Sequence, residues 1–512
     1  MSILVRSIEG GLRRCSGNSL LGQSACIMDQ SGITPNTSNQ QLVNGSDNDS
    51  ATALLQEKQA RRRENLGDVT FREYMTVGIL CFVNLINYMD RFTIAGVLAD
   101  VKSEFNIGDD WAGLLQTVFV IAYMVFAPMF GYLGDRYSRR KIMAAGVALW
   151  TMTTQLFFSC QNYYWFAVFR GLVGIGEASY STIAPTIISD LFVGNVRSKM
   201  LAFFYFAIPV GSGFGYIVGS VAGAIAGDWR WGLRVTPVLG AVAVILVAFV
   251  MQDPERGQAE ESTMKPTSYG DDLRALVKNP SFMLSTLAFT CVAFVTGALA
   301  WWGPLFIYLG LNLQPGVAIS KESVSFKFGI VGMLAGACGV PAGAALAQRL
   351  RARVPHCDPL VCGLALLASA PLVYLALIAV SAHVAPTYLL MFLGMFTLNL
   401  TWSIVADVVL YIVIPPRRST AEAFQILISH MLGDAGSPYL IGVISESLKR
   451  SLGSGDMESP SMSVQFRALQ YALFLTCFVE VIGGAFFLIT TKYIVRDKQK
   501  VDRAIAGKMY IV

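Results

Sequence analysis

Residues Gly131 to Lys141 read Gly-Tyr-Leu-Gly-Asp-Arg-Tyr-Ser-Arg-Arg-Lys, a short basic loop between two long apolar runs. The runs on either side, Trp111–Leu133 and Lys141–Ser159, have about the length that a helix needs to cross the hydrocarbon core of a membrane. An Arg-rich loop between such runs is typical of the cytoplasmic face of a multi-pass membrane protein. The fold therefore has to be predicted from membrane helices rather than from a water-soluble core.

The composition of the whole chain agrees with this interpretation. Of the 512 residues, 54% are hydrophobic and only 14% are charged, whereas roughly 25% charged residues is usual in soluble proteins. The net charge of +5 comes mainly from basic residues beside the apolar runs. Membrane topology explains that placement, so we expect no nucleic acid as a partner.

The sequence gives no sign of covalent chemistry. Its nine cysteines are scattered singly, with neither a CxxC pair nor a disulfide framework. No nucleophile with its base, no metal-ligand cluster and no phosphate-binding loop is apparent. We therefore expect no enzyme activity, no cofactor and no metal.

The apolar runs form two groups of six, separated by a polar stretch at residues 252–280. This pattern predicts an all-α membrane protein with twelve transmembrane helices in two six-helix bundles, residues 69–251 and 281–493, and cytoplasmic tails at residues 1–68 and 494–512. The predicted helices are Tyr74–Leu98, Trp111–Leu133, Lys141–Ser159, Tyr163–Ile188, Met200–Ala226, Leu233–Met251, Ser281–Leu309, Phe326–Ala347, Pro359–Val380, Thr387–Ile414, Ala421–Leu448 and Phe466–Tyr493.

The two halves also resemble each other in sequence. Arg197-Ser198 precedes a helix containing Tyr216-Ile217-Val218-Gly219, and Arg418-Ser419 precedes one containing Tyr439-Leu440-Ile441-Gly442. Parallel repeats of this kind place a substrate site between the halves, near the middle of the membrane. Lys and Arg gather in alternate loops on one side, which predicts that both termini are cytoplasmic.

The loop quoted first resembles the conserved loop of the major facilitator superfamily, G-x-x-x-D-R-x-G-R-R, with Ser138 in place of the second glycine. Gly131 would let two helices approach closely, and Asp135 with Arg136, Arg139 and Arg140 would form an ion-pair latch that closes one conformation. The alternative is a plain positive loop. The matching loop, Gly343–Arg353, lacks the aspartate, so a latch there should be weaker.

Ionisable side chains inside the predicted helices are the candidate functional residues, because they are costly in a membrane. The first helix carries Asp90 and Arg91 after Asn87 and Tyr88, and the fourth carries Arg170 and Glu177, seven residues and about 10 Å apart on one face. The carboxylates suit proton carriage and the arginines suit an anionic headgroup. The alternative is a set of ion pairs that only fix helix packing.

In the second half the candidates are Asp407, His430 and Asp434. His430 and Asp434 are four residues apart and share a helix face, which suits a proton relay, although a hydrogen-bonded histidine without such a role is an equal alternative. Glu480 has no obvious partner in the sequence and receives no role.

Three longer segments, Asn84–Leu98, Arg170–Thr186 and His430–Leu440, resemble the Spinster family of this superfamily. The resemblance implies transport of lysolipids or sphingoid phosphates such as sphingosine-1-phosphate, coupled to protons, in late endosomes and lysosomes. It assigns proton-linked switching to Asp90 and Glu177, and charge balance or headgroup contact to Arg91 and Arg170.

The leading hypothesis is therefore a monomeric, proton-linked exporter of an amphiphilic lysolipid or sphingolipid that works by alternating access within the lipid membrane. Two alternatives remain open. One is a carrier of small organic or sugar phosphates that uses the same arginines. The other is a membrane scaffold for lysosomal trafficking that has lost transport.

Overall fold

The secondary structure is helical throughout the described part of the chain. The computed structural model describes residues 66–157, 161–192, 194–254, 269–414, 417–452 and 461–507, which contain no β-strand. All of them belong to one compact unit, Arg61–Val512. Most of the predicted N-terminal tail, residues 1–65, and residues 255–268 of the predicted linker lie outside these ranges.

The first half contains a helix at each of the six predicted places. A short 3-10 helix, η1 (Leu66–Asp68), precedes it. The longer helices are α2 (Phe71–Gly96), α3 (Leu98–Phe105), α4 (Asp109–Arg136), α5 (Arg139–Phe157), α6 (Tyr163–Leu191), α7 (Gly194–Ala226) and α8 (Arg230–Ile245), which a π-helical turn, η2 (Leu246–Val250), continues.

The second half also has helix at each predicted place, although two of the predicted helices are divided. Before it comes α9 (Tyr269–Val277), which lies within the polar stretch at residues 252–280, the predicted linker between the halves. The helices of the second half are α10 (Pro280–Leu311), α11 (Lys321–Arg351), α12 (Cys357–Ala379), α13 (Val384–Asn399), α14 (Thr401–Ile412), α15 (Arg418–Ser429), η4 (His430–Asp434), α16 (Gly436–Leu452) and α17 (Met462–Gly507). Helix α17 continues past its predicted end at Tyr493.

Among the described residues, nine helices are long and apolar enough to cross a membrane by length and composition. Helices α5 and α6 and the α15–α16 pair are not among them. Helix α6 carries Arg170 and Glu177 in its interior, and the π-turn η4 divides α15 from α16. Twelve membrane crossings therefore stay a prediction.

Several helices begin at residues whose side chains satisfy the free backbone N–H groups of the first turn. Thr70 and Glu73 form a reciprocal capping box at the start of α2. Asn279 caps α10, where Pro280 occupies the first turn and needs no N–H partner. These polar capping residues mark the N-terminus of each of these helices, where the loop ends and the apolar run begins.

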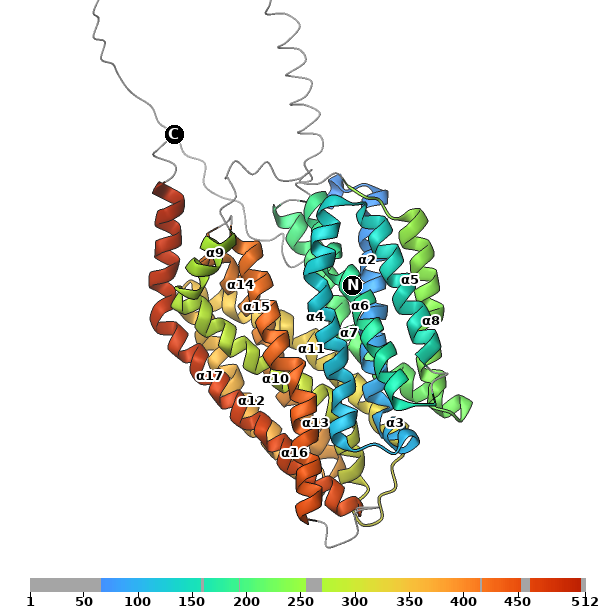
Figure 1. Ribbon diagram of the computed structural model, residues 1–512. Helices are drawn as coiled ribbons and strands as arrows, with labels where there is room; N and C mark the ends of the chain where they lie inside the picture. Colours follow the sequence, from blue (N-terminus) through green and yellow to red (C-terminus); the bar gives the residue numbers. More distant parts are fainter. Residues whose placement is uncertain are drawn as a thin grey trace, which may run out of the picture. The chain divides into compact units, whose positions relative to one another are not determined.

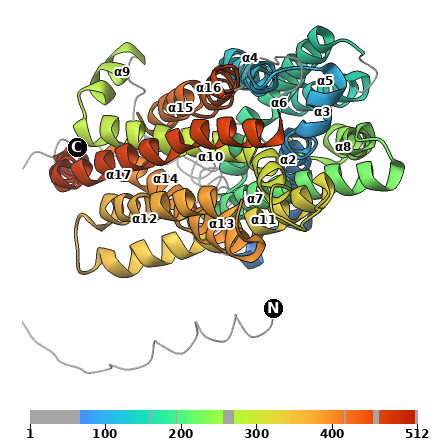
Figure 2. The ribbon, with the colours of Figure 1, turned by 90° about the horizontal axis from the view of Figure 1, so that it is seen from below.

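Each half is a bundle of closely packed helices. In the first half α2 packs against α7, α4 and α5 against α6, and α5 against α8. In the second, α17 packs against α10 and α12, and α13 against α11 and α12. The halves meet along α4 with α16 and along α7 with α11, which Figures 1 and 2 show side by side.

The contact between α4 and α16 depends on glycines. A Cβ at Gly113 would collide with the carbonyl of Pro438, and one at Gly442 with the carbonyl of Asp109. A glycine on each helix thus lets the two backbones touch, as small residues do in membrane bundles.

Charged residues join the halves at the end of the bundles that contains α3, opposite the end at which α2 begins and α17 finishes (Figure 1). The side chain of Asp109 binds Lys102 of its own half and Lys449 of the other, the latter at 2.5 Å. The Asp109 backbone N–H donates to Glu446 at 3.2 Å. We call these four residues the Asp109 cluster and this end the α3 end. Lys321 with Asp100, at 2.7 Å, forms a second ion pair between the halves there.

Candidate functional site

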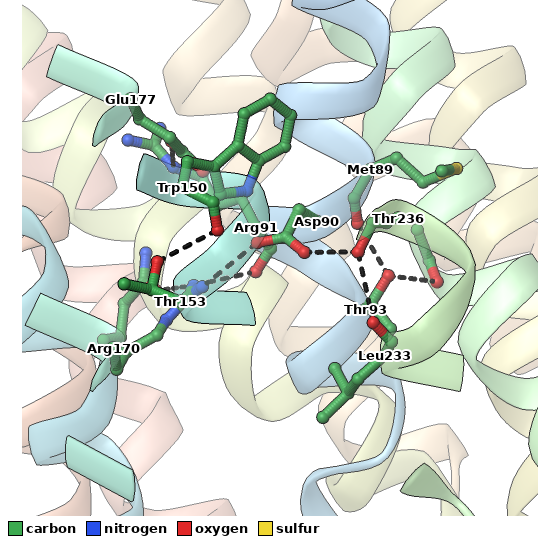
Figure 3. A network of polar contacts seen from close by, with 12 residues as sticks. Met89, Asp90, Arg91, Thr93, Trp150, Thr153, Arg170, Glu177, Leu233 and Thr236 are labelled. Carbon is green, nitrogen blue, oxygen red and sulfur yellow. Dashed lines mark hydrogen bonds and ion pairs between the residues drawn. The ribbon is translucent and has the colours of Figure 1, made fainter. Parts of the chain in front are cut away.

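Two ion pairs are buried inside the first half. The inner pair joins Asp90 of α2 to Arg170 of α6, with 3.8 Å between Oδ2 and Nη1 (Figure 3). The other carboxylate oxygen, Oδ1, accepts a hydrogen bond of 2.6 Å from Thr236 of α8. Asp90 and Arg170 are 2% and 1% exposed, so this pair has no contact with bulk solvent. It ties three helices together at one point.

The outer pair joins Arg91 of α2 to Glu177 of α6, with 3.9 Å between Nε and Oε2. The side chain of Asn87 faces the same carboxylate. In the amide orientation that satisfies both of its polar atoms, its nitrogen donates to Glu177 Oε1 at 2.8 Å and Oε2 at 2.6 Å. Asn87 therefore holds Glu177 in place while Arg91 balances its charge.

Both pairs are loose, since their N···O separations exceed hydrogen-bond distance. The Nε atoms of Arg91 and Arg170 have no hydrogen-bond acceptor within the described residues. Arg170 uses Nη2 instead, which donates to the backbone carbonyl of Arg91 at 3.2 Å and to Gln116 at 3.4 Å. Each arginine thus retains donor capacity that its carboxylate partner does not use.

Aromatic rings supply the remaining contacts of the two guanidinium groups. The ring of Phe119 in α4 lies 4.7 Å from the Arg91 Cζ and 4.2 Å from the Arg170 Cζ. Tyr88 and Tyr123 are 5.4 Å and 5.6 Å from the Arg91 Cζ. Cations over ring faces in a dry environment gain about 2 kcal/mol. Phe119 therefore contacts one member of each pair and couples them, in addition to the backbones of α2 and α6 that both pairs share.

The cluster of Asp90, Arg91, Arg170 and Glu177 is balanced, with two positive and two negative groups. Burying such charges is expensive, and removing one partner of a buried pair costs about 3–5 kcal/mol because the other remains uncompensated. A proton or an anion that enters the cluster also leaves one buried charge uncompensated. The arrangement can therefore convert binding into a conformational preference.

The second half presents His430 and Asp434 toward this cluster. Nδ1 of His430 lies 2.8 Å from Oδ1 of Asp434, and the imidazole contacts the ring of Tyr123 edge-on at 5.9 Å. Both residues lie in η4, whose π-helical turn interrupts the α15–α16 helix. Such turns are frequent at functional sites. The structure thus brings together eight of the nine predicted residues, with Tyr88 and Tyr123 between the halves.

Asp407 is the exception. Its side chain is 51% exposed and pairs with Arg351 of α11 at 3.1 Å. Arg351 also binds Asp358 of α12 through two contacts of 2.8 and 3.0 Å, and Tyr411 donates to Asp358 at 2.7 Å. Asp407 therefore belongs to an ion-pair group in the loop region where a weak latch was predicted. The loop Gly343–Arg353 has no aspartate of its own, and Asp358 of α12 and Asp407 of α14 pair with Arg351 instead.

The predicted latch of the first half differs from expectation in two details. Arg139 pairs with Asp190 of α6. A Cβ at Gly131 would meet nothing within 4 Å, so the predicted close helix approach at Gly131 is wrong. That approach occurs one turn on, where a Cβ at Gly134 would meet Ile183 at 3.0 Å. The side chains of Asp135 and Arg136 lie outside the described residues, and the latch role of Arg139 and Arg140 stays a prediction.

Four residues of the site were missed in the sequence. Gln116 and Thr236 are polar residues within apolar runs, a signal that could have found them. Phe119 and Tyr123 have no such signal, because aromatic residues are common throughout these helices. Their role depends on α4 packing against α6, which places both rings beside the arginines.

Two helical halves that meet along α4 with α16 and α7 with α11, with a balanced ion cluster buried in the first half, are characteristic of secondary transporters. The sequence of residues 80–437 matches the family model of the Major Facilitator Superfamily. The chain is accordingly a multi-pass membrane transporter of that superfamily, and not an enzyme.

Comparison with known proteins identifies the family within this superfamily. The chain is 56% identical over 484 residues to the protein spinster of Drosophila melanogaster, covering 86% of this chain and 80% of the other. It is 51% identical over 452 residues to protein spinster homolog 1 of Homo sapiens, covering 86% and 84%. The chain belongs to the Spinster family.

A solved structure shares the fold. It is described as a bacterial homologue of the human lysosomal transporter Spinster in an inward-facing, unoccupied conformation, and it aligns with a TM-score of 0.74 at 19% identity over 83% of this chain and 98% of that one.

Proposed function

We propose that the protein exports a lysophospholipid or a sphingoid phosphate from the lumen of late endosomes or lysosomes, coupled to protons, by alternating access. The observation that carries this proposal is the buried cluster of Asp90, Arg91, Arg170 and Glu177, in which two arginines keep unused donor capacity. Of the two, Arg91 lies beside Tyr123, which contacts His430 of the second half. A transporter that binds an anionic headgroup and a proton needs these two kinds of group.

Arg91 is the residue proposed to meet the headgroup. It is the least buried of the four, at 8% exposed, and it lies nearest to the second half through Tyr123 and His430. A guanidinium group matches the oxygens of a phosphate in two-point hydrogen bonding. The tail of the substrate would then lie against apolar helix faces, such as those around Leu299, Phe328 and Met395 in the second half.

Glu177 is the residue proposed to carry the proton. When Glu177 is ionised, it compensates Arg91; once it is protonated, Arg91 has a full positive charge free for an anionic ligand. The proton and the headgroup would therefore favour each other's binding, which is the requirement for symport. His430 with Asp434 would relay protons from the other half.

The Asp109 cluster supports alternating access. It joins the halves at the α3 end through a buried carboxylate and lysines from both halves. With both termini in the cytoplasm, the α3 end faces the lumen, and this conformation is closed on the lumenal side. One chain contains both halves of the fold, and we propose the monomer as the transporting unit.

Flux measurements on the reconstituted protein test the proposal. Purified full-length protein in proteoliposomes should move labelled lysophospholipid faster when a pH gradient is imposed. Glu177→Gln should abolish the acceleration by the gradient, and Arg91→Ala should abolish flux. Glu480→Gln is the matched control, because Glu480 is also fully buried but bonds to Ser369 rather than to a cation. Wild-type gradient dependence in Glu177→Gln would refute the assignment.

The alternatives give different results in the same assay. If the substrate is a small organic phosphate, shortening the acyl tail should leave its competition with the labelled lipid unchanged. If the protein is a scaffold, no lysolipid or phosphate should move at either pH. A steady loss of affinity with each methylene removed from the tail supports the lipid.

A further inference from the structure

Helix α17 continues beyond the membrane as a docked, rigid extension. Ile494, Asp497 and Val501 are buried along one of its faces. Asp497 accepts a hydrogen bond of 2.7 Å from the Ser281 hydroxyl at the start of α10, and Lys498 lies 5.2 Å from the ring of Tyr411. These contacts fix the rotation of the helix about its own axis.

The opposite face of this extension is basic. Lys492, Arg496, Lys500 and Arg503 are spaced by four, four and three residues and are exposed, so they form one stripe along the helix. Because the other side of the helix is docked, the stripe has a fixed orientation. A flexible tail of the same composition would present no such surface.

An open groove of about 230 Å³ lies beside the stripe. It is lined by Lys278 and Asn279, which precede α10, and by Lys500 of α17, with Ile412, Ile414 and Val501 as its apolar part. Asp497 also lines it, but its carboxylate is engaged by Ser281, Lys500 and Arg496. Arg274 of α9 and Lys278, which follows α9, are also exposed.

The groove lies where three apolar helical stretches begin or end. Helix α10 begins at Pro280, α14 finishes at Ile412, and the apolar part of α17 gives way to charges after Val495. The Lys278 ammonium group lies over an apolar strip here, and the Lys500 ammonium group, which gives one of its three N–H donors to Asp497, keeps the others. This arrangement matches a lipid that has a phosphate above its glycerol and acyl chains. Basic clusters and pockets at this level of membrane proteins favour anionic phospholipids.

We propose that this groove between α9 and α17 binds the headgroup of an anionic phospholipid of the surrounding membrane. Lys278 and Lys500 contact the phosphate, while Ile412, Ile414 and Val501 contact the upper part of the acyl chains. This site is separate from the central ion cluster and does not depend on what the transporter carries.

Binding of defined lipids to the full-length protein tests the proposal. The purified protein is titrated with phosphatidylserine or phosphatidylcholine, and the lipid retained is counted by native mass spectrometry. Phosphatidylserine should bind at least one site that phosphatidylcholine does not occupy. The variant Lys278→Gln/Lys500→Gln should bind phosphatidylserine at that site about ten- to thirty-fold more weakly, as expected for the loss of two surface lysines.

The control removes the same charge elsewhere at the same end. Lys141 is exposed in the first turn of α5 and Arg353 is exposed just after α11, and Lys141→Gln/Arg353→Gln should bind phosphatidylserine as the wild type does. Equal weakening in both double variants would overturn the proposal, because the attraction would then be diffuse. Unchanged binding in Lys278→Gln/Lys500→Gln, or displacement of phosphatidylserine by inorganic phosphate alone, would also overturn it.

Discussion

The Asp109 cluster allows the closure of the α3 end to be weakened by a single side chain. Lys449 and Asp109 are 8% and 2% exposed, lie 2.5 Å apart and come from different halves. Lys449→Met keeps the length and apolar stem of the side chain but removes its charge. The change therefore acts on the ion pair between the halves and leaves the packing of α16 nearly intact.

The size of the effect follows from the partners that remain. Breaking a buried ion pair costs about 3–5 kcal/mol when the other charge is left alone. Here Lys102 of the same half still compensates Asp109, so we take about 2–3 kcal/mol. Once the halves separate, the side chains at positions 449 and 109 are both in water, so the substitution costs no free energy in the open conformation. The equilibrium between closed and open α3 ends should therefore shift about 30- to 150-fold toward opening.

Spin labels on either side of the α3 end measure this shift. Ser103 in α3 and Ser381 between α12 and α13 are exposed and belong to different halves, so cysteines placed there in a cysteine-free background report their separation by pulsed EPR. Lys449→Met should add a longer distance to the distribution. Arg230→Met is the control, because Arg230 pairs with Glu104 inside the first half and both are partly exposed, a pair worth about 0–1 kcal/mol. An unchanged distribution in a folded Lys449→Met protein would refute this account of closure, as would an equal change in Arg230→Met.

Three further predictions test other contacts. Asp90→Asn leaves Arg170 without its buried partner and should lower stability by about 3–5 kcal/mol in thermal melts. Thr236→Val removes one hydrogen bond to the Asp90 carboxylate and should cost less, about 1.5–3 kcal/mol; equal melting losses would contradict the ranking. Gly113→Ala should open the α3 end in the same EPR assay because its Cβ collides with Pro438, whereas Gly78→Ala, where a Cβ meets nothing within 4 Å, should not. Asp407→Asn should leave the pH dependence of lysolipid flux unchanged, since Asp407 pairs with Arg351 and is half exposed; a loss as large as that of Glu177→Gln would return Asp407 to the central site.

The helices and the central cluster were predictable because membrane burial leaves a strong signal in the sequence. An apolar run has few alternatives to a helix in a bilayer, and a charge inside such a run must find a partner. Asp90, Arg91, Arg170 and Glu177 could therefore be selected without knowledge of packing. Once α2 and α6 lie side by side, opposite charge allows only Asp90 with Arg170 and Arg91 with Glu177; what the sequence did not specify is that these two helices place their charges at the same level.

Other features depend on geometry between helices, which no local pattern specifies. Asp407 satisfies the same rule as Asp90 in sequence, yet α14 presents it to Arg351 and to solvent. Phe119 is one of 31 phenylalanines and is distinguished only by its two arginine contacts. The continuation of α17 past Tyr493 was missed because its last turns are charged, whereas docking of Ile494, Asp497 and Val501 onto neighbouring helices stabilises them.

The placement of charge indicates by which route the central cluster can act on the interface between the halves. Both ion pairs of the central cluster lie within the first half, on α2 and α6, so opening the interface does not break them. The Asp109 cluster, in contrast, takes Lys449 from the second half and is broken by any separation at the α3 end. A change of charge in the centre must therefore act on the interface through groups that lie between the halves, chiefly Tyr123 and His430. Replacing Tyr123 by Phe keeps the ring beside both Arg91 and His430, whereas Tyr123→Ala removes it, so only the alanine variant should uncouple the distance at the α3 end from the pH of the medium.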